Sequence, residues 1–170
     1  RKDRELKIRN DAGKQLWRKH EKFDLACLTL PENFPVRALP WEVLATKEDA
    51  KLLKTGDSIF AAVFPEREES NGAGFPVIRQ GIISNYPVVP IDAHHQFLID
   101  TTSFSGDSGG PVMHETLRRE DGSPVVLGFV IGLRRWTETI KESKFVERRI
   151  HHSLALSYGI HAAFVREILP

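Results

Sequence analysis

Between two apolar runs the chain reads Thr101-Thr102-Ser103-Phe104-Ser105-Gly106-Asp107-Ser108-Gly109-Gly110-Pro111-Val112. A serine hydroxyl is a weak nucleophile at neutral pH, so acyl chemistry at Ser108 needs a base and hydrogen-bond donors for the oxyanion. Because Gly106 carries no side chain, the backbone can turn until the N–H groups of Gly106 and Ser108 point into one pocket. Ser108 is therefore the candidate nucleophile, and an ordinary glycine-rich turn is the alternative.

The segment Gly-Asp-Ser-Gly-Gly-Pro-Val at residues 106–112 resembles the nucleophile loop of the trypsin/chymotrypsin-fold serine proteases. The resemblance is closest to bacterial trypsin-like (HtrA-like) peptidase domains and extends from about Leu6 to Leu169. It implies an all-β fold of two antiparallel six-stranded Greek-key β-barrels with a short C-terminal helix. Residues 1–40 would then be the C-terminal part of an incomplete first barrel. Residues 41–170 would hold the inter-barrel connector, the second barrel and the helix, within one protease domain.

A second motif lies at Asp24, which opens the apolar run Leu25-Ala26-Cys27-Leu28. A carboxylate in such a place must be solvated or partnered. The run is similar to the Asp-Leu-Ala-x-Leu strand at which these proteases carry their catalytic aspartate. The resemblance thus implies that Asp24 orients the catalytic histidine, and a turn-capping aspartate is the alternative.

The resemblance also implies a substrate pocket, with oxyanion donors at Gly106 and Ser108. Thr102 would form the pocket floor, and its walls would be Ser103, Ile131, Gly132 and Leu133. A preference for Lys or Arg requires a buried carboxylate, whereas Thr102 offers only a hydroxyl. We therefore expect small or medium apolar residues before the cleaved bond.

The catalytic base is the member of the triad that the sequence lacks. In this fold the order along the chain is His, Asp, Ser, and His20 alone precedes Asp24. His20 lacks the Ala-His context of the family, so we expect the catalytic histidine upstream of residue 1. The 170-residue chain alone would then hydrolyse peptides at least ~10³-fold more slowly than a longer chain that includes this histidine.

Metal and cofactor binding are not predicted. His94-His95 and His151-His152 are adjacent pairs, and neighbouring side chains on a strand point to opposite faces, which makes chelation unfavourable. His114-Glu115 resembles the start of a zinc-protease motif, but Arg118 stands where the second histidine is needed. His161 is expected to pack at the C-terminal strand-to-helix junction.

The composition limits the function classes. The chain has 24 basic and 23 acidic residues and a net charge of +1, so no global field favours nucleic acid or an anionic membrane. The apolar run near Val125–Leu133 is far shorter than the roughly 18 residues of a membrane helix. We expect one soluble domain with a peptide or protein substrate, no nucleic-acid partner and no membrane span.

Cys27 is the single cysteine, so no disulfide forms within the chain, and the thiol is expected to be a small core residue. This favours a reducing compartment and, with the resemblance, the bacterial cytoplasm. The bacterial envelope is the alternative, because envelope proteases of this fold often lack disulfides too. The chain begins at Arg1 without a signal peptide, so we expect a fragment or a processed product.

Hydrophobic patterns and turn signals predict short strands with little helix. Residues 134–149, of mixed charge, are expected to form a solvated surface loop. The predicted elements are a hairpin over 5–19, strands over 57–64, 76–84, 96–100, 112–114, 124–133 and 153–158, and helices over 46–53 and 160–169.

Two functions remain open at this point. The first is a serine endopeptidase that hydrolyses peptide bonds through an acyl-enzyme intermediate. The second is a catalytically inactive protease-like module for binding or regulation. An intact Gly-Asp-Ser-Gly-Gly favours the enzyme, because a scaffold has no need of a serine in that loop.

Overall fold

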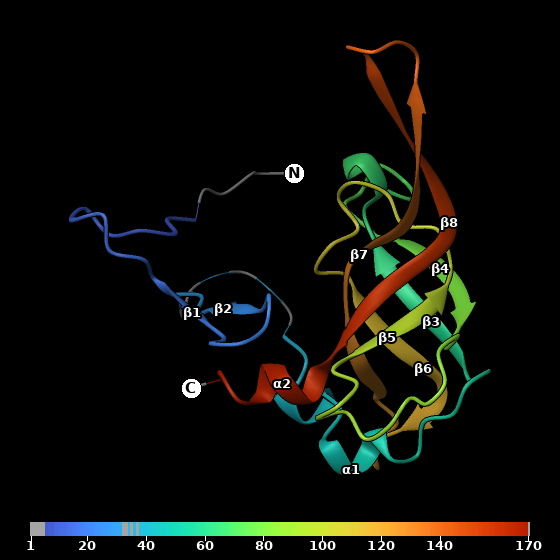
Figure 1. Ribbon diagram of the computed structural model, residues 1–170. Helices are drawn as coiled ribbons and strands as arrows, with labels where there is room; N and C mark the ends of the chain where they lie inside the picture. The colour runs from blue at the N-terminus through green and yellow to red at the C-terminus, as the bar shows by residue number, and fades with distance from the viewer. Residues whose placement is uncertain (1–5, 32–33, 35, 37, 170) are drawn as a thin grey trace.

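Most of the described chain forms one six-stranded antiparallel sheet. The computed structural model describes residues 6–31, 34, 36 and 38–169. The strand order is β4-β3-β6-β7-β8-β5, and every neighbouring pair is antiparallel. The strands are β3 (Ser58–Val63), β4 (Val77–Ile82), β5 (Gln96–Asp100), β6 (Pro111–Arg118), β7 (Pro124–Lys141) and β8 (Glu147–His161) (Figure 1).

The sheet curls until its two edge strands approach each other, which gives a half-barrel. Ile83, just after β4, forms an antiparallel bridge with Ile99 of β5. A Cβ atom at Gly81 would lie 2.7 Å from the carbonyl oxygen of Asp100, so glycine is what lets the two backbones come this close. The sequence predicted a bulge or a bend at Gly81. β4 pairs with β3 without a register shift, so the bulge is wrong, and the bend stays a prediction.

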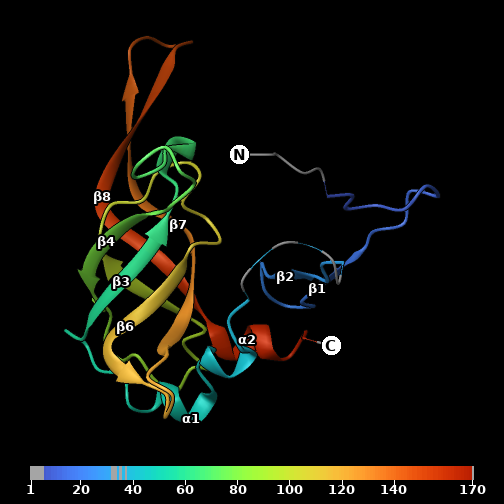
Figure 2. The same cartoon turned by 180° about the vertical axis from the view of Figure 1, so that it is seen from behind.

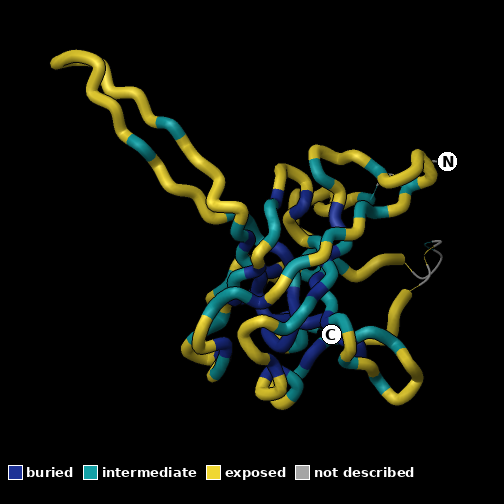
Figure 3. The backbone as a smooth tube through the Cα atoms, turned by 90° about the vertical axis from the view of Figure 1, so that its right-hand side faces the viewer, coloured by how far each residue is buried: buried dark blue, intermediate teal, exposed yellow. Residues whose placement is uncertain are grey.

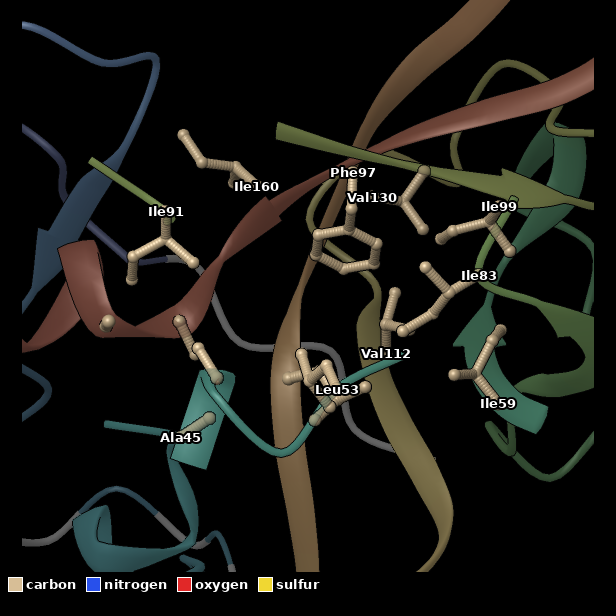
Figure 4. Close-up of a cluster of buried hydrophobic side chains, with 14 of the residues drawn as sticks. Ala45, Leu53, Ile59, Ile83, Ile91, Phe97, Ile99, Val112, Val130 and Ile160 are labelled. Carbon is tan, nitrogen blue, oxygen red and sulfur yellow. The ribbon is translucent and has the colours of Figure 1, made fainter. Parts of the chain in front are cut away.

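The core fills the inside of the curl. In β3 the side chains of Ile59, Ala61 and Val63 are buried and the intervening ones are half-buried, as the alternation of a strand with one inner face requires. Phe97 and Ile99 of β5 point into the same core (Figure 4). Residues 101–110, which we call the serine loop, lie between β5 and β6, and both strands are thus anchored by buried apolar side chains.

Beyond the sheet, β7 and β8 continue as a long two-stranded hairpin, which we call the arm (residues 134–153). It projects away from the rest of the chain (Figure 1) and is exposed along most of its length (Figure 3). Pairing runs from Arg135 with Ser153 to Lys141 with Glu147. The prediction of a surface loop over 134–149 is therefore wrong, although the segment is solvated as expected.

A bulge marks the point where the arm leaves the sheet. Arg135 pairs with Ser153, whereas the preceding Arg134 pairs with Leu156, so the residues between Ser153 and Leu156 are left outside the ladder. One of them, Ala155, has a φ of 55°, in the left-handed region that a residue with a side chain seldom adopts. A bulge bends a strand and re-aims its side chains, and here it turns the arm out of the sheet.

The N-terminal segment holds a separate two-stranded sheet of β1 (Trp17–Lys19) and β2 (Ala26–Leu28). A hairpin was predicted over 5–19, and residue 5 lies outside the described residues. Residues Arg9 and Gln15 do form an isolated bridge, but β1 pairs with β2 instead. The described residues therefore show one curled sheet and one small sheet (Figure 2).

Short helices complete the fold. Thr46 and Asp49 form a capping box at α1 (Lys47–Ala50), in which each backbone N–H donates to the other residue's side chain. The predicted Thr46 cap is confirmed. The C-terminal helix α2 (Ala162–Arg166) buries Phe164, whose ring lies 4.5 Å from that of Phe23 in the N-terminal segment. The remaining helices are the 3₁₀ turns η1 (Trp41–Val43) and η2 (Pro65–Arg67). Across the described residues, no helix combines the length and the apolar character that crossing a membrane demands.

Candidate active site

The serine loop joins β5 to β6, and the buried side chain of Asp107 fixes its conformation by a hydrogen bond within the loop. This residue is only 1% exposed, and its Oδ2 accepts the Phe104 N–H over 2.8 Å. The Gly109 N–H donates to the Val130 carbonyl of β7 over 2.7 Å, and the Val130 N–H returns a bond of 2.9 Å to Gly110. The loop is thereby fixed to the sheet, while the adjacent Ser108 side chain is exposed at the surface.

Gly106 takes a conformation that other residues rarely adopt. Its φ is 94°, and a Cβ atom there would overlap the carbonyl oxygen of Phe64 in the chain leading to η2. Both facts require glycine. Among the described residues, the N–H groups of Gly106 and Ser108 have no hydrogen-bond acceptor. Two free donors on either side of the buried Asp107 are what an oxyanion site needs.

The first cavity at Ser108, which we call the Asp24 cavity, has a volume of about 510 Å³. Asp24, just before β2, lines it together with Ser108 and Gly109 of the serine loop. Residues far apart in the sequence are thus brought to one cavity. Cys27 also lines it, and burial raises the pKa of its thiol although Arg18 opposes this, so the thiol stays protonated at neutral pH.

No histidine lines the Asp24 cavity, although all seven histidines lie in the described part of the chain. His20 has both ring nitrogens engaged: Nδ1 accepts the N–H groups of Lys22 and Phe23 over 3.1 and 3.3 Å, and Nε2 lies 3.1 Å from Oε2 of Glu167. The ring is buried and connects the N-terminal segment to α2. These contacts give His20 a structural role.

The remaining histidines are dispersed. His114 Nδ1 accepts the backbone N–H groups of Thr116 and Leu117, which fixes its ring in the middle of β6. Burial lowers the pKa of His161 to about 4, so this residue is neutral at pH 7, in the junction where it was expected. Within the described ranges, no three His, Cys, Asp or Glu side chains are grouped as a metal site requires.

A second cavity, the arm cavity, is also lined by Ser108 and has a volume of about 520 Å³. Four of the predicted pocket residues, Ser103, Ile131, Gly132 and Leu133, line it together with Ser108. Thr102, the predicted floor, is not among the residues that line it. The Thr102 carbonyl instead accepts Nη1 of Arg79 over 3.1 Å.

Sequence reasoning missed Phe104 and Ser105 of the serine loop as lining residues of the arm cavity, and it also missed three residues outside that loop, namely Arg135, His151 and Ser153. These last three residues lie at the base of the arm, close to the bulge. Arg135 belongs to the segment predicted as a surface loop, and His151 and Ser153 follow that segment. The signal that was available was the run of β-forming residues Trp136-Thr137, which favours a strand over a loop.

Comparison of the sequence with protein-family models and with curated proteins found no match.

Proposed function

We propose that this chain carries the catalytic site of a serine endopeptidase of the trypsin-like kind. Ser108 attacks the scissile carbonyl to form an acyl-enzyme, and water then releases the acyl group. The observation that carries the proposal is that Asp24 and Ser108, which belong to two separate motifs, line one cavity. An ordinary glycine-rich turn would not be expected to share a cavity with an aspartate from the N-terminal segment.

Each side chain receives a role from its surroundings. The free N–H groups of Gly106 and Ser108 would bind the oxyanion of the tetrahedral intermediate. Asp24 is exposed and lines the shared cavity, and its carboxylate would orient and stabilise an imidazolium. In the same proposal, the curled six-stranded sheet corresponds to the second barrel of the family, and the β1–β2 sheet to part of the first.

The proposed reaction needs a general base in the Asp24 cavity. A cavity of about 510 Å³ has room for an imidazole ring, and its position between Ser108 and Asp24 suits a ring that bonds to both. None of the seven histidines lines the cavity. Free imidazole should therefore enter it and act as the base.

The alternative function is a protease-like module that binds or regulates without turnover. The exposed Ser108, the free N–H pair and the raised pKa of the neighbouring Cys27 thiol favour the serine as the reacting group. A binding module would need none of these features.

A fluorophosphonate probe tests the two functions in the presence of imidazole. We expect covalent labelling of the chain, with the adduct located on Ser108 by peptide mass spectrometry. The Ser108→Ala variant should lose the label. The matched variant Ser105→Ala, in the same loop, should keep it. Labelling that survives Ser108→Ala, or is absent from the wild-type chain, would exclude the enzyme.

A further inference from the structure

We propose that the arm cavity binds an acidic side chain, glutamate or aspartate, of the peptide at the residue that precedes the scissile bond. The inference rests on the proposed function, because an attack by Ser108 is what places that residue in the cavity. Ser108 lines both cavities. When the scissile carbonyl is bound at Ser108, the side chain of the residue that supplies it enters either the Asp24 cavity or the arm cavity. In the proposed mechanism the Asp24 cavity holds the base.

The charge of the arm cavity is positive. Among the described residues, Arg135 and His151 are the titratable groups that line it, and none of the described Asp or Glu residues does. A second guanidinium lies close by: that of Arg79 is 5.0 Å from the ring centre of Phe104, which lines the cavity. A pocket lined by one sign of charge attracts the opposite charge and excludes its own. Lys and Arg side chains are therefore disfavoured.

The hydrogen-bond donors at the arm are free. The Arg135 side chain makes no hydrogen bond or ion pair with the described residues, so its planar donor group is available to a carboxylate. The Ser153 Oγ accepts the Ala155 N–H over 3.2 Å, which leaves its O–H free to donate. His151 Nδ1 lies 2.9 Å from Oγ1 of Thr137, so Nε2 is the ring nitrogen that remains available to a ligand.

The buried wall of the cavity has no such donor. Ser157 donates its hydroxyl to the Thr101 carbonyl over 2.6 Å, so the hydroxyl of Ser103 is committed to the oxygen of Ser157. Ser103 lines the cavity but cannot also donate to a ligand. The charged donor for a carboxylate thus lies at the base of the arm, whereas Ser105 and Ser108 offer only hydroxyls. Ile131 and Leu133 offer apolar contact to the methylene groups of the side chain.

This inference replaces the preference for small apolar residues expected from the sequence. That expectation depended on Thr102 as the pocket floor, and Thr102 does not line the arm cavity. It also took no account of the arm, which was predicted to be a loop. The bulge at Ala155 is what brings Arg135 and Ser153 together at the cavity.

Binding of short product-like peptides tests the inference without turnover. The wild-type chain is titrated by calorimetry with N-acetyl-Ala-Ala-Glu and with the matched peptides that end in Gln, Leu or Lys, all of which share the terminal carboxylate. We expect the Glu peptide to bind at least about ten-fold more tightly than the Gln peptide, because a charge-assisted bond to Arg135 is gained. The Lys peptide should bind most weakly.

Variants of the arm locate the effect. Arg135→Met combined with His151→Gln should reduce the Glu-over-Gln ratio to within about three-fold. Arg134→Met is the matched control, since residue 134 does not line the cavity, and it should keep the ratio. Both variants change exposed side chains, and circular dichroism checks their fold.

The outcomes separate this inference from the proposed function. Equal binding of the Glu and Gln peptides, or no binding of the Glu peptide, overturns the inference even when Ser108 is labelled by fluorophosphonate. A Glu preference that depends on Arg135 and His151, without any labelling of Ser108, supports acidic recognition but overturns the enzyme. A preference that survives the double variant means that the carboxylate binds elsewhere.

Discussion

At the scale of single residues, the site depends on backbone positions as much as on reacting groups. Asp107 is buried and holds the loop from below, so that Ser108 next to it can be exposed. Gly106 supplies a φ of 94° in a space closed by the Phe64 carbonyl. Neither residue reacts in the proposed chemistry, yet both set the direction of the two free N–H groups.

Gly106→Ala should therefore damage the loop more than the same change at Gly109. Both glycines have a positive φ, 94° and 86°, so both variants carry a strain of about 1–2 kcal/mol. Only at position 106 would the new methyl group also overlap backbone, whereas nothing lies within 4 Å at position 109. We expect a lower melting temperature and at least about 10²-fold slower labelling of Ser108 for Gly106→Ala. Equal effects of the two variants would contradict this account.

His161 makes stability depend on pH. Its folded pKa is about 4, below the ordinary value of 6.5, because the ring is buried and His95 lies nearby, despite a bond to the His94 backbone. As the pH falls below about 6.5, the unfolded chain takes up the proton first. The contribution of His161 to the free energy of unfolding is thus complete above pH 6.5. It falls by about 3 kcal/mol between pH 6.5 and 4 and changes no further below pH 4.

The pH effect is measured as the melting temperature at pH 7 minus that at pH 4.5. His161→Gln removes the titrating ring and should make this difference clearly smaller than in the wild-type chain. The control is His152→Gln, because the side chain of His152 is 46% exposed on the arm. It should leave the difference unchanged. If His161→Gln showed as large a difference in melting temperature as the wild-type chain, other groups would be the cause of the pH dependence.

At the scale of elements, the arm differs from the rest of the chain in having no buried face. Its stability comes from pairing along both strands and from cross-strand contacts such as Trp136 with His152, whose ring centres are 5.1 Å apart. It packs on nothing else among the described residues except at its base. Its function in the present account is restricted to that base, where Arg135 and His151 line the arm cavity.

Shortening the arm should consequently leave the core intact. A variant that replaces residues 138–150 with Asn-Gly should keep the curled sheet and change the melting temperature by only a few degrees, because no buried apolar group is removed. Thermal denaturation and circular dichroism measure this. A control variant in the core, Ile59→Ala, should cost about 2–5 kcal/mol. A loss of similar size in the shortened chain would mean that the arm stabilises the fold.

At the scale of the whole molecule, the sequence was informative wherever a residue's role is local. The exact span of β5 and the Thr46 cap follow from the hydrophobic pattern and from capping chemistry. The arm was missed because both of its faces are solvated. Its strands therefore lack the alternation of apolar and polar residues that identifies a half-buried strand.

The arm cavity was predicted only in part for a related reason. Ser103 and Leu133 lie on local motifs, whereas the place of Arg135 and Ser153 depends on the register between β7 and β8. A bulge of this kind changes register without a strong sequence signal, since its positive φ falls on Ala155 rather than on a glycine. The cationic character of the cavity therefore appears only when the strands are paired in three dimensions.

The central claim is that Ser108 and Asp24 flank one catalytic cavity, and the dependence of Ser108 labelling on imidazole tests it most directly. The rate of fluorophosphonate attachment is measured by mass spectrometry over a series of imidazole concentrations in the wild-type chain and in Asp24→Asn. We predict a rate that rises and saturates in the wild-type chain, as a bound base requires. In Asp24→Asn the acceleration should be at least about ten-fold smaller. Labelling that stays unaffected by imidazole, or that is accelerated equally in both chains, would contradict the account.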